Sequence, residues 1–305
     1  MRIGVDLGGT KIEAAVLAAD GRIVLRQRVR TPQGNYAETI EAVAKLVEAC
    51  EASSGAAATV GIGIPGAISP ATGLVKNANS TWLIGRPLAD DLARRIGRPV
   101  RLANDANCFA LSEAVDGAGA GADTVFGVIL GTGVGAGIVV GGRVLTGANA
   151  VAGEWGHNPL PGMLGGSGAG VEWPGPPCYC GRSGCIETFL SGPGLARDFQ
   201  QHSGRRLSPA DVVASASRGD VEADACLGRY EDRLARGLAS IINVLDPNVI
   251  VLGGGMSNVT RLYENVPQLW SRYVFSDVIA TRLVPPVHGD SSGVRGAAWL
   301  WPLSA

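Results

Sequence analysis

The chain has 305 residues, of which 46% are hydrophobic and 17% are charged, and its formal net charge is -1. This composition is typical of a folded globular protein with enough length for two domains, and it excludes a disordered chain. The charges form no basic stretch, so we expect neither nucleic acid nor an anionic membrane surface as a partner.

The N-terminus and the cysteines indicate the compartment. Residues 1–6 lack the apolar core of a signal peptide, and the sequence contains no stretch of about 18 apolar residues. We therefore expect a cytoplasmic protein, in which cysteines are metal ligands or buried thiols more readily than disulfides. Cys50, Cys108 and Cys226 lie in apolar helical patterns and are expected in the core.

The first elements predict a meander of strands that opens on a glycine turn. Apolar runs at 2–5, 12–17 and 23–29 predict the strands, and Asp6–Lys11 forms the turn between the first two. A turn between two strands differs from the lysine-containing loop of common nucleotide-binding proteins, which opens a helix. It is either a plain tight hairpin or a different phosphate-binding turn.

In the second interpretation, the turn binds a nucleotide. Its amides and the Thr10 hydroxyl hold the β- and γ-phosphates, because bare backbone lets successive N–H donors approach an anion. Asp6 then organises Mg²⁺, through water, as a hard oxygen ligand.

Helices and strands alternate after the meander. The hydrophobic pattern predicts helices over 36–52 and 88–96, and short strands over 60–64 and 100–103. A polar loop, Lys76–Trp82, separates the two pairs. This alternation is typical of an α/β domain.

Asn104 and Asp105 follow a strand and precede a helix, which places them on the rim of the predicted sheet. Asp105 has two possible roles. It caps the helix, which is worth about 1 kcal/mol, or it orients and deprotonates an alcohol that attacks a γ-phosphoryl group. In the second case Asn104 binds a neighbouring hydroxyl.

The opening pattern recurs after a joint of small residues at 117–121. A strand over 125–130, a turn at Gly131–Gly133 and a strand over 135–140 repeat the strand, glycine-threonine turn and hairpin. We interpret the chain as a duplicated α/β unit that faces a shared cleft, with Thr132 matching the threonine of the first turn as a phosphate clamp.

A third glycine turn, Gly253–Gly255, follows a long helix over 222–243 and a strand over 249–252. Three such turns fit one nucleotide, with two on its phosphates and the third beside its sugar or base. A final helix near 293–300 is expected to pack back on the first domain.

The densest chemistry lies in four possible metal ligands, namely His157, Cys178, Cys180 and Cys185. Three thiolates and an imidazole make a closed tetrahedral zinc site, and a closed site is structural. The metal would then hold neighbouring groups rigidly.

Two carboxylates, Glu154 and Glu187, flank these ligands. They are either a solvated charge set or acceptors for the vicinal hydroxyls of a polyol, to which an imidazole holding zinc offers its second nitrogen.

With these pieces assembled, the chain resembles the ROK family, named for repressors, open reading frames and kinases. The resemblance rests on Asp6–Lys11, Asn104–Asn107, Gly131–Gly135, Gly153–His157, Cys178–Glu187 and Val251–Gly255. It implies an α/β, actin-like (ribonuclease-H-like) ATPase fold, with two lobes around a cleft, and it implies ATP and Mg²⁺.

The resemblance also implies roles for individual residues. Asp105 is the expected catalytic base. The expected substrate contacts are Gly66, Asn79, Asn104, Asp105, Glu154, His157 and Glu187. The expected nucleotide contacts are Asp6, Gly8, Gly9, Thr10, Lys11, Gly131, Thr132, Gly133, Gly254 and Gly255. His157, Cys178, Cys180 and Cys185 are expected to bind Zn²⁺.

Within the family, Pro65–Gly73, Lys76–Trp82 and His288–Trp299 resemble the bacterial fructokinase and mannokinase branch. This implies transfer from ATP to the C6 hydroxyl of fructose, mannose or glucose. The alternatives are an N-acetylhexosamine kinase and a non-catalytic sugar-sensing regulator. The regulator needs a DNA-binding module, for which the early first turn leaves no space. The preferred sugar and the use of polyphosphate in place of ATP stay open.

The expected lobes are residues 1–117, completed by the C-terminal helix 293–305, and residues 118–292, which contain the zinc segment. Family precedent implies a homodimer. Leu160–Pro177, rich in glycine and proline, matches no shared motif, and we interpret it as a flap over the sugar.

Overall fold

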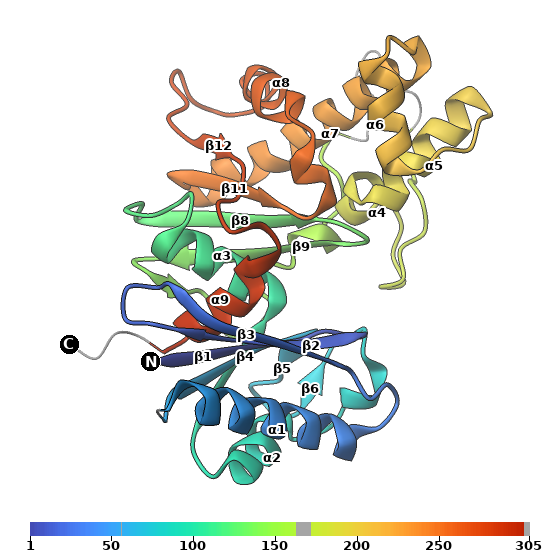
Figure 1. The fold of residues 1–305 in the computed structure, drawn as a ribbon. Helices are drawn as coiled ribbons and strands as arrows, with labels where there is room; N and C mark the ends of the chain where they lie inside the picture. The colour runs from blue at the N-terminus through green and yellow to red at the C-terminus, as the bar shows by residue number, and fades with distance from the viewer. Residues whose placement is uncertain (56, 163–171, 302–305) are drawn as a thin grey trace. The chain divides into compact units, whose positions relative to one another are not determined.

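The structure is a computed structural model that describes residues 1–55, 57–162 and 172–301 (Figure 1). The chain divides into two compact units. The first comprises Met1–Gly121, Gly137–Gly153 and Val287–Ala305, and the second comprises Ala122–Ala136 and Glu154–Pro286. The central part of the predicted flap, residues 163–171, lies outside the described residues.

The first unit is built on a five-stranded sheet in the order β3-β2-β1-β4-β7. Its strands are β1 (Arg2–Leu7), β2 (Lys11–Leu17), β3 (Ile23–Arg30), β4 (Thr59–Ile64) and β7 (Val100–Asn104), with a small hairpin of β5 (Ala67–Ile68) and β6 (Val75–Lys76). Its helices are α1 (Tyr36–Ser54), α2 (Leu88–Ile96), α3 (Asp105–Asp116) and α9 (Ser292–Trp299), with short 3-10 turns η1 (Thr81–Leu83) and η4 (Gly289–Ser291). The first three strands form the predicted antiparallel meander, and β4 and β7 run parallel to β1.

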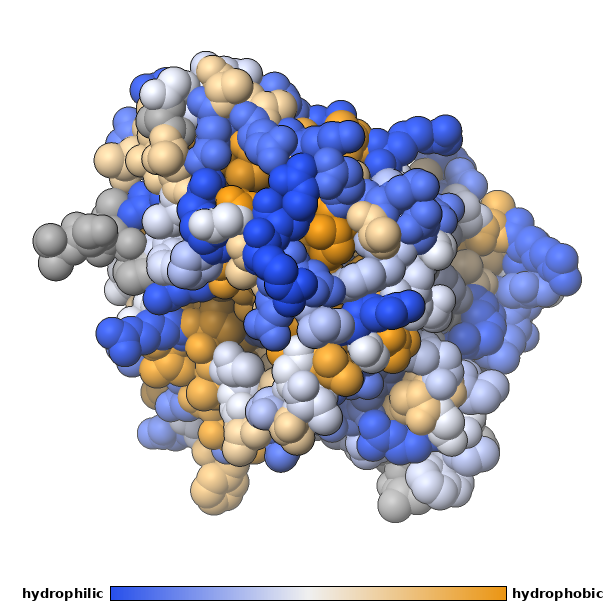
Figure 2. Space-filling model, turned by 90° about the horizontal axis from the view of Figure 1, so that it is seen from below, coloured by the Kyte–Doolittle hydropathy of each residue, from blue (hydrophilic) through white to orange (hydrophobic). Residues whose placement is uncertain are grey.

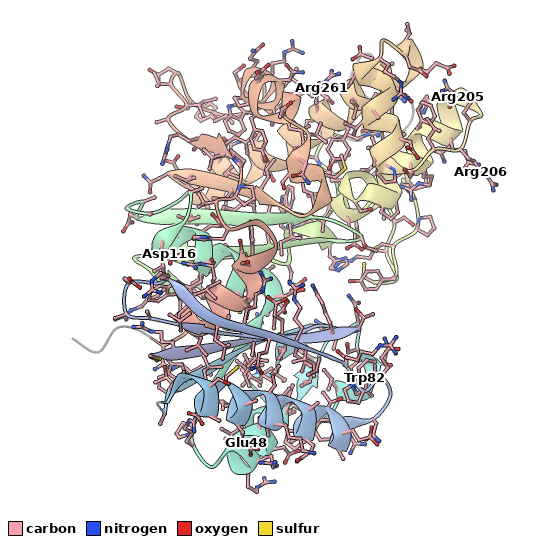
Figure 3. The ribbon with its side chains drawn as sticks, viewed as in Figure 1. Glu48, Trp82, Asp116, Arg205, Arg206 and Arg261 are labelled. Atoms are coloured by element: carbon pink, nitrogen blue, oxygen red, sulfur yellow. The ribbon has the colours of Figure 1, made fainter. Side chains whose placement is uncertain are left out.

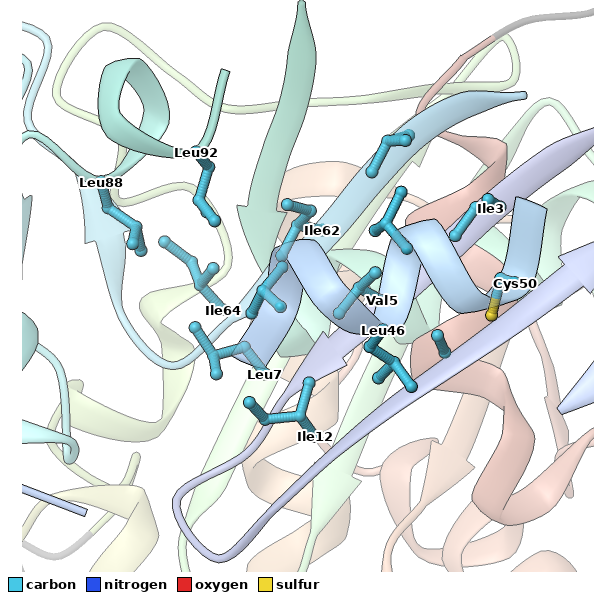
Figure 4. Packing of buried hydrophobic residues seen from close by; sticks show 14 of the residues in the cluster. Ile3, Val5, Leu7, Ile12, Leu46, Cys50, Ile62, Ile64, Leu88 and Leu92 are labelled. Carbon is cyan, nitrogen blue, oxygen red and sulfur yellow. The ribbon is translucent and has the colours of Figure 1, made fainter. Parts of the chain in front are cut away.

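Side-chain alternation along β1 determines what lies on each face of this sheet. Ile3, Val5 and Leu7 point to one face, where they join a buried apolar cluster beneath α1 and α2 (Figure 4). Fully burying a side chain of this size stabilises the fold by about 1.5–3 kcal/mol. The residues between them, Gly4 and Asp6, face α9.

The outer side of this layer is hydrophilic. Arg95 of α2 forms ion pairs with Glu41 at 2.7 Å and with Glu48 at 2.8 Å on α1, and Arg98 pairs with Glu51 at 2.6 Å (Figure 3). Seen from this side, a band of hydrophilic residues crosses the surface (Figure 2). The apolar stripe of α1 therefore faces the sheet, as its periodicity predicts.

The second sheet has the order β10-β9-β8-β11-β12. Its strands are β8 (Thr124–Leu130), β9 (Val134–Val140), β10 (Arg143–Val144), β11 (Val249–Gly253) and β12 (Arg282–Val284). The helices of the second unit are α4 (Ile186–Leu190), α5 (Gly192–Ser203), α6 (Pro209–Ser217), α7 (Val221–Leu245) and α8 (Arg261–Trp270), with 3-10 turns η2 (Glu154–His157) and η3 (Gly255–Asn258). The strand, glycine turn and hairpin predicted as a repeat are all present.

The unit boundary falls within β9, so residues 137–153 group with the first unit, whereas the sequence predicts a second lobe that begins at residue 118. The reason is a close approach to α3. A Cβ atom on Gly137 would lie 2.6 Å from the Ala106 carbonyl oxygen. Only a glycine lets β9 come this near to the helix.

Ion pairs bind the long helix α7 to its neighbours. Arg261 at the start of α8 pairs with Glu231 of α7 at 2.5 Å (Figure 3). Arg233 of α7 pairs with Asp198 of α5 at 2.8 Å and with Glu172 at 2.7 Å, and all three side chains are buried. Removing one partner from such a group leaves a buried charge uncompensated, which is strongly destabilising.

Helices α4, α5 and α6 were not expected from the sequence. α5 begins Gly192-Pro193-Gly194, a tripeptide typical of a loop, but the Ser191 side chain accepts a hydrogen bond from the Gly194 N–H and caps the helix. Among the described residues, every helix is too short or too polar to cross a lipid bilayer.

The approach of α9 to the sheet leads to a stability prediction. A Cβ atom on Gly61 of β4 would collide with the Ala297 carbonyl oxygen of α9. We therefore expect Gly61→Ala to destabilise the protein by about 2 kcal/mol or more, because neither backbone can move away cheaply. Thermal unfolding measures the effect.

The matched control is Gly228→Ala on α7, where an added Cβ would meet open space. Alanine favours a helix over glycine by about 1 kcal/mol, so this variant should be as stable as the parent or more so. An equally small effect of both substitutions would contradict the close packing of α9.

Candidate functional site

The turn between β1 and β2 holds its carbonyl groups on one side. The Thr31 hydroxyl donates to the Gly8 carbonyl at 2.7 Å, and the Gln33 side-chain amide donates to the Gly9 carbonyl at 2.8 Å. The C=O and N–H groups of a trans peptide point in opposite directions, so the N–H groups of Gly9 and Thr10 point away from Thr31 and Gln33. Successive N–H groups on one side suit an anion such as phosphate.

Asp6 lies beside this turn, on the face of β1 that meets α9. Burial, followed by the charges of Asp105 and Glu13, raises the pKa of Asp6 to about 6. A Cβ atom on Gly293, in the first turn of α9, would lie 3.5 Å from Asp6 Oδ2. The structure therefore brings Asp6 near Asp105, and the carboxylate of Asp6 is a suitable hard ligand for Mg²⁺.

The capping role considered for Asp105 belongs to Asn104. The Asn104 Oδ1 atom accepts hydrogen bonds from the N–H groups of Ala106 at 2.8 Å and Asn107 at 3.3 Å. Asp105 is the first residue of α3 and is exposed, and its own Oδ1 also accepts from Ala106 at 2.8 Å. Because Asn104 Oδ1 is occupied by the helix cap, the Asn104 side chain would contact a sugar hydroxyl through Nδ2, as the hydrogen-bond donor.

The predicted substrate loop is anchored next to β4. A Cβ atom on Gly66 would lie 2.9 Å from the backbone nitrogen of Ala78, so Gly66 packs directly on the loop that carries the exposed Asn79. Just beyond it, the indole N–H of Trp82 donates to Thr39 Oγ1 at 3.2 Å (Figure 3). These contacts hold both ends of the loop near Asn79.

The second and third glycine turns are neighbours in the second unit, because they follow the adjacent parallel strands β8 and β11. The Gly192 N–H donates to the Gly131 carbonyl at 2.8 Å, so the Thr132 N–H points away from α5. Gly254 has φ +76° and lies against the end of β8, where a Cβ atom would be 2.5 Å from the Leu130 carbonyl oxygen. Only glycine fits this position.

The four predicted metal ligands converge. One ligand atom from each of His157, Cys178, Cys180 and Cys185 lies within 4.8 Å of the others. His157 Nδ1 is 3.5 Å from Cys178 Sγ, and Cys180 Sγ is 3.6 Å from Cys185 Sγ. Hydrogen bonding from the Arg182 backbone lowers the pKa of Cys180 to about 6, which favours the thiolate that binds metal. Three sulfurs and one nitrogen suit tetrahedral zinc.

Glu187 lies between this cluster and the second glycine turn. Its Oε2 atom accepts a hydrogen bond from the Val134 N–H at 2.9 Å, and its Oε1 atom is 4.0 Å from Cys178 Sγ. A Cβ atom on Gly133 would be 2.6 Å from Oε2, so glycine is needed there for the carboxylate to reach the turn. One carboxylate thus joins the possible metal site to a possible phosphate site.

Glu154 begins the 3-10 turn η2, which ends at His157, so the two side chains are placed by one short element. The Tyr179 hydroxyl is hydrogen-bonded to His157 Nε2 at 2.9 Å. Tyr179 was not expected at the site, although its position between two candidate cysteine ligands was the available signal. Thr31 and Gln33 were also missed, because nothing in their local pattern marks them as supports of the first turn.

The predicted site residues therefore form two groups, one in each unit. The first unit holds Asp6, Gly8, Gly9, Thr10, Lys11, Gly66, Asn79, Asn104 and Asp105. The second unit holds Gly131, Thr132, Gly133, Glu154, His157, Cys178, Cys180, Cys185, Glu187, Gly254 and Gly255. Each unit thus provides amides suited to phosphate together with acidic groups suited to hydroxyls or cations.

Comparison with known proteins gives consistent matches across the chain. A model described as the ROK family matches residues 2–303. An N-acetyl-D-glucosamine kinase of Salmonella newport (strain SL254) is 41% identical over 300 residues, which cover 98% of this chain and 99% of that protein.

Solved structures also match this chain over nearly its full length. A ROK hexokinase from Thermus thermophilus is 33% identical, with a TM-score of 0.85 and coverage of 98% of this chain and 97% of that one. A ROK family glucokinase from Streptomyces griseus, in complex with glucose and AMPPNP, is 28% identical, with a TM-score of 0.78 and coverage of 99% of both chains. The expected α/β, actin-like ATPase fold with two lobes is confirmed.

The raised pKa of Asp6 predicts a dependence of stability on pH. Because burial favours the protonated form of Asp6, its contribution to the free energy of unfolding is fully present below the ordinary aspartate pKa of about 4. This contribution is lost as the pH rises through about 6. Ionised Asp6 therefore weakens the folded state at neutral pH. We expect Asp6→Asn to raise the melting temperature more at about pH 7.5 than at about pH 4.5, in buffer without added Mg²⁺.

Asp90→Asn, which alters an exposed aspartate in the first turn of α2, is the control and should give the same small difference at both pH values. A pH-independent effect of Asp6→Asn would show that the Asp6 carboxyl does not titrate in this range.

Proposed function

The chain belongs to the ROK family, and from this premise we propose that it is an ATP-dependent sugar kinase whose acceptor is N-acetylglucosamine or a related N-acetylhexosamine. The observation that carries this proposal is the 41% identity to an N-acetyl-D-glucosamine kinase over nearly the full length of both chains. The site residues of both units are compatible with phosphoryl transfer to an alcohol.

A second candidate is a kinase for an unsubstituted hexose such as glucose, which the similarity to the Thermus thermophilus hexokinase favours. The expected preference for fructose or mannose has no support among these relatives. The segments behind that expectation have structural tasks: Pro65–Gly73 packs on the loop at Ala78, and His288–Trp299 contains α9, which packs on β1 and β4. Packing of this kind does not distinguish one sugar from another.

The proposed reaction uses groups whose surroundings suit their tasks. ATP would supply the phosphoryl group, and Mg²⁺, which the Asp6 carboxylate would help to hold, would neutralise charge on its phosphates. In this proposal the N–H groups of Gly9, Thr10 and Thr132 would bind phosphate oxygens, and the hydrogen bonds of the Gly8, Gly9 and Gly131 carbonyls support this direction. Gly254 packs directly against the end of β8, which keeps the third glycine turn next to the second.

On the acceptor side, Asp105 is the proposed general base. It takes the proton of the sugar hydroxyl while the hydroxyl oxygen forms a bond to the γ-phosphorus and the bond from that phosphorus to the ADP oxygen breaks. Asn104 Nδ2 donates to a neighbouring hydroxyl. Glu154, His157 and Glu187 orient the remaining hydroxyls, with Glu187 held in place through Oε2.

We further propose that His157, Cys178, Cys180 and Cys185 hold Zn²⁺. The convergence of their ligand atoms supports this assignment. A Cys₃His set has no open position for water, so the metal would stabilise the segment and fix His157 and Glu187 without taking part in the chemistry.

Asp105→Asn tests the assignment of the base. Loss of the proton acceptor should lower kcat by about a hundredfold or more, while N-acetylglucosamine still binds, because the variant keeps the shape of the side chain. Phosphorylation and isothermal titration calorimetry measure the two effects. Asp90→Asn, also in the first turn of a helix, should keep full activity, and near-normal turnover of Asp105→Asn would exclude this base.

A panel of sugars tests the acceptor. ADP release is measured with N-acetylglucosamine, N-acetylmannosamine, glucose, mannose and fructose, and kcat/KM should be highest for N-acetylglucosamine. Higher kcat/KM for glucose would favour the second candidate. If sugars bound but none of them caused release of ADP from ATP, a sugar-sensing regulator would be favoured instead. Replacing ATP with polyphosphate tests the identity of the phosphoryl donor.

Metal analysis tests the zinc proposal. The purified protein should contain about one zinc ion per chain, and Cys180→Ser should lose most of it and unfold at a lower temperature. Cys50→Ala, which changes a core cysteine on α1 outside the cluster, should keep its zinc. The proposal would be contradicted if the parent protein without zinc were fully active and as stable as the protein with zinc.

A further inference from the structure

Tyr179 is an exposed aromatic side chain in the segment that carries the three candidate cysteine ligands. It lies between Cys178 and Cys180, and 75% of it is exposed, whereas the nearby Trp155 is only 2% exposed. Its ring meets the His157 ring edge-on, with the ring centres 5.1 Å apart. A side chain with so little burial can leave its position at low cost.

The two nitrogens of His157 face different partners. Nδ1 is directed at the cluster, 3.5 Å from Cys178 Sγ, which makes it the nitrogen for a metal. Nε2 is then the nitrogen that remains for a sugar hydroxyl, and in this structure the Tyr179 hydroxyl is hydrogen-bonded to it at 2.9 Å. The hydroxyl of Tyr179 therefore holds the position that the proposed function assigns to substrate.

The surroundings of this phenol are also those proposed for the sugar. A phenol is a neutral hydrogen-bonding group at physiological pH. The Tyr179 side chain also lies near Glu154 and Glu187, the two carboxylates of the proposed sugar site. A neutral hydroxyl among Glu154, His157 and Glu187 has the chemical character of a sugar hydroxyl.

We propose that the Tyr179 hydroxyl occupies the hydrogen-bonding position of a substrate hydroxyl at His157 Nε2 in the sugar-free protein, and that the sugar displaces it on binding. This proposal rests on the proposed function. The Tyr179 hydroxyl keeps Nε2 satisfied while the site is empty, and the exposed ring swings into solvent when the sugar arrives. Each sugar molecule must then replace one hydrogen bond that already exists.

This competition predicts that removal of the hydroxyl improves sugar binding. Tyr179→Phe keeps the ring and loses only the oxygen. Calorimetry on the zinc-loaded protein should show a Kd for N-acetylglucosamine that is about twofold to tenfold lower than that of the parent, as expected for one competing neutral hydrogen bond. Tyr273→Phe, which removes a tyrosine hydroxyl bonded to Asp232 elsewhere in the second unit, should leave the Kd unchanged.

The other outcomes overturn the proposal in distinguishable ways. An unchanged Kd would show that the hydroxyl does not compete with the sugar. A higher Kd would show that Tyr179 assists binding, and accompanying loss of zinc would make it a positioning residue for His157. If neither the parent nor Tyr179→Phe bound any sugar of the panel, the proposed function itself would fail, and this proposal with it.

Discussion

The alternation of side chains along β1 is the constraint on which the first unit depends. Ile3, Val5 and Leu7 must share one face because successive residues of a strand point to opposite sides, and their burial supplies much of the core. The opposite face then receives Gly4 and Asp6. The absent side chain of Gly4 admits the backbone of α9, and this close approach places Asp6 beside the first turn of that helix. Hydrophobic packing on one side of the strand thus positions Asp6, a candidate functional carboxylate, on the other side.

In the second unit, polar contacts position a carboxylate, that of Glu187. Glu187 begins a short helix directly after the last cysteine ligand, and its carboxylate reaches the second glycine turn because Gly133 has no side chain. The geometry of the possible metal cluster and that of the phosphate turn are therefore linked through one residue. The same segment presents Tyr179 to the second nitrogen of His157. The proposed sugar contacts, the possible metal cluster and the possible phosphate-binding turn therefore share residues in this unit.

The sequence was informative wherever function needs a particular residue in a short segment. The glycine turns, the meander and the four candidate metal ligands could be recognised because their spacing is local, and the atoms of the four candidates do converge. The role of Asn104 could not, because Asn104 and Asp105 are adjacent and only the backbone decides which of them caps α3. Helix α5 was missed because Gly192 and Gly194 are typical of a loop, and its capping serine stabilises it nonetheless. The expectation of fructose or mannose found no support among the relatives named above, and it rested on segments that pack within the fold.

By itself the sequence determined the family, the duplicated α/β plan and the candidate reactive groups, because these depend on residue type and on spacing along the chain. Only the tertiary structure decided which atoms of those groups are already engaged. It directs the amides of the first turn away from Thr31 and Gln33, commits one oxygen of Glu187 to Val134, and places a phenol on His157 Nε2. These are contacts between residues distant in sequence or set by backbone direction, and local patterns carry no record of them.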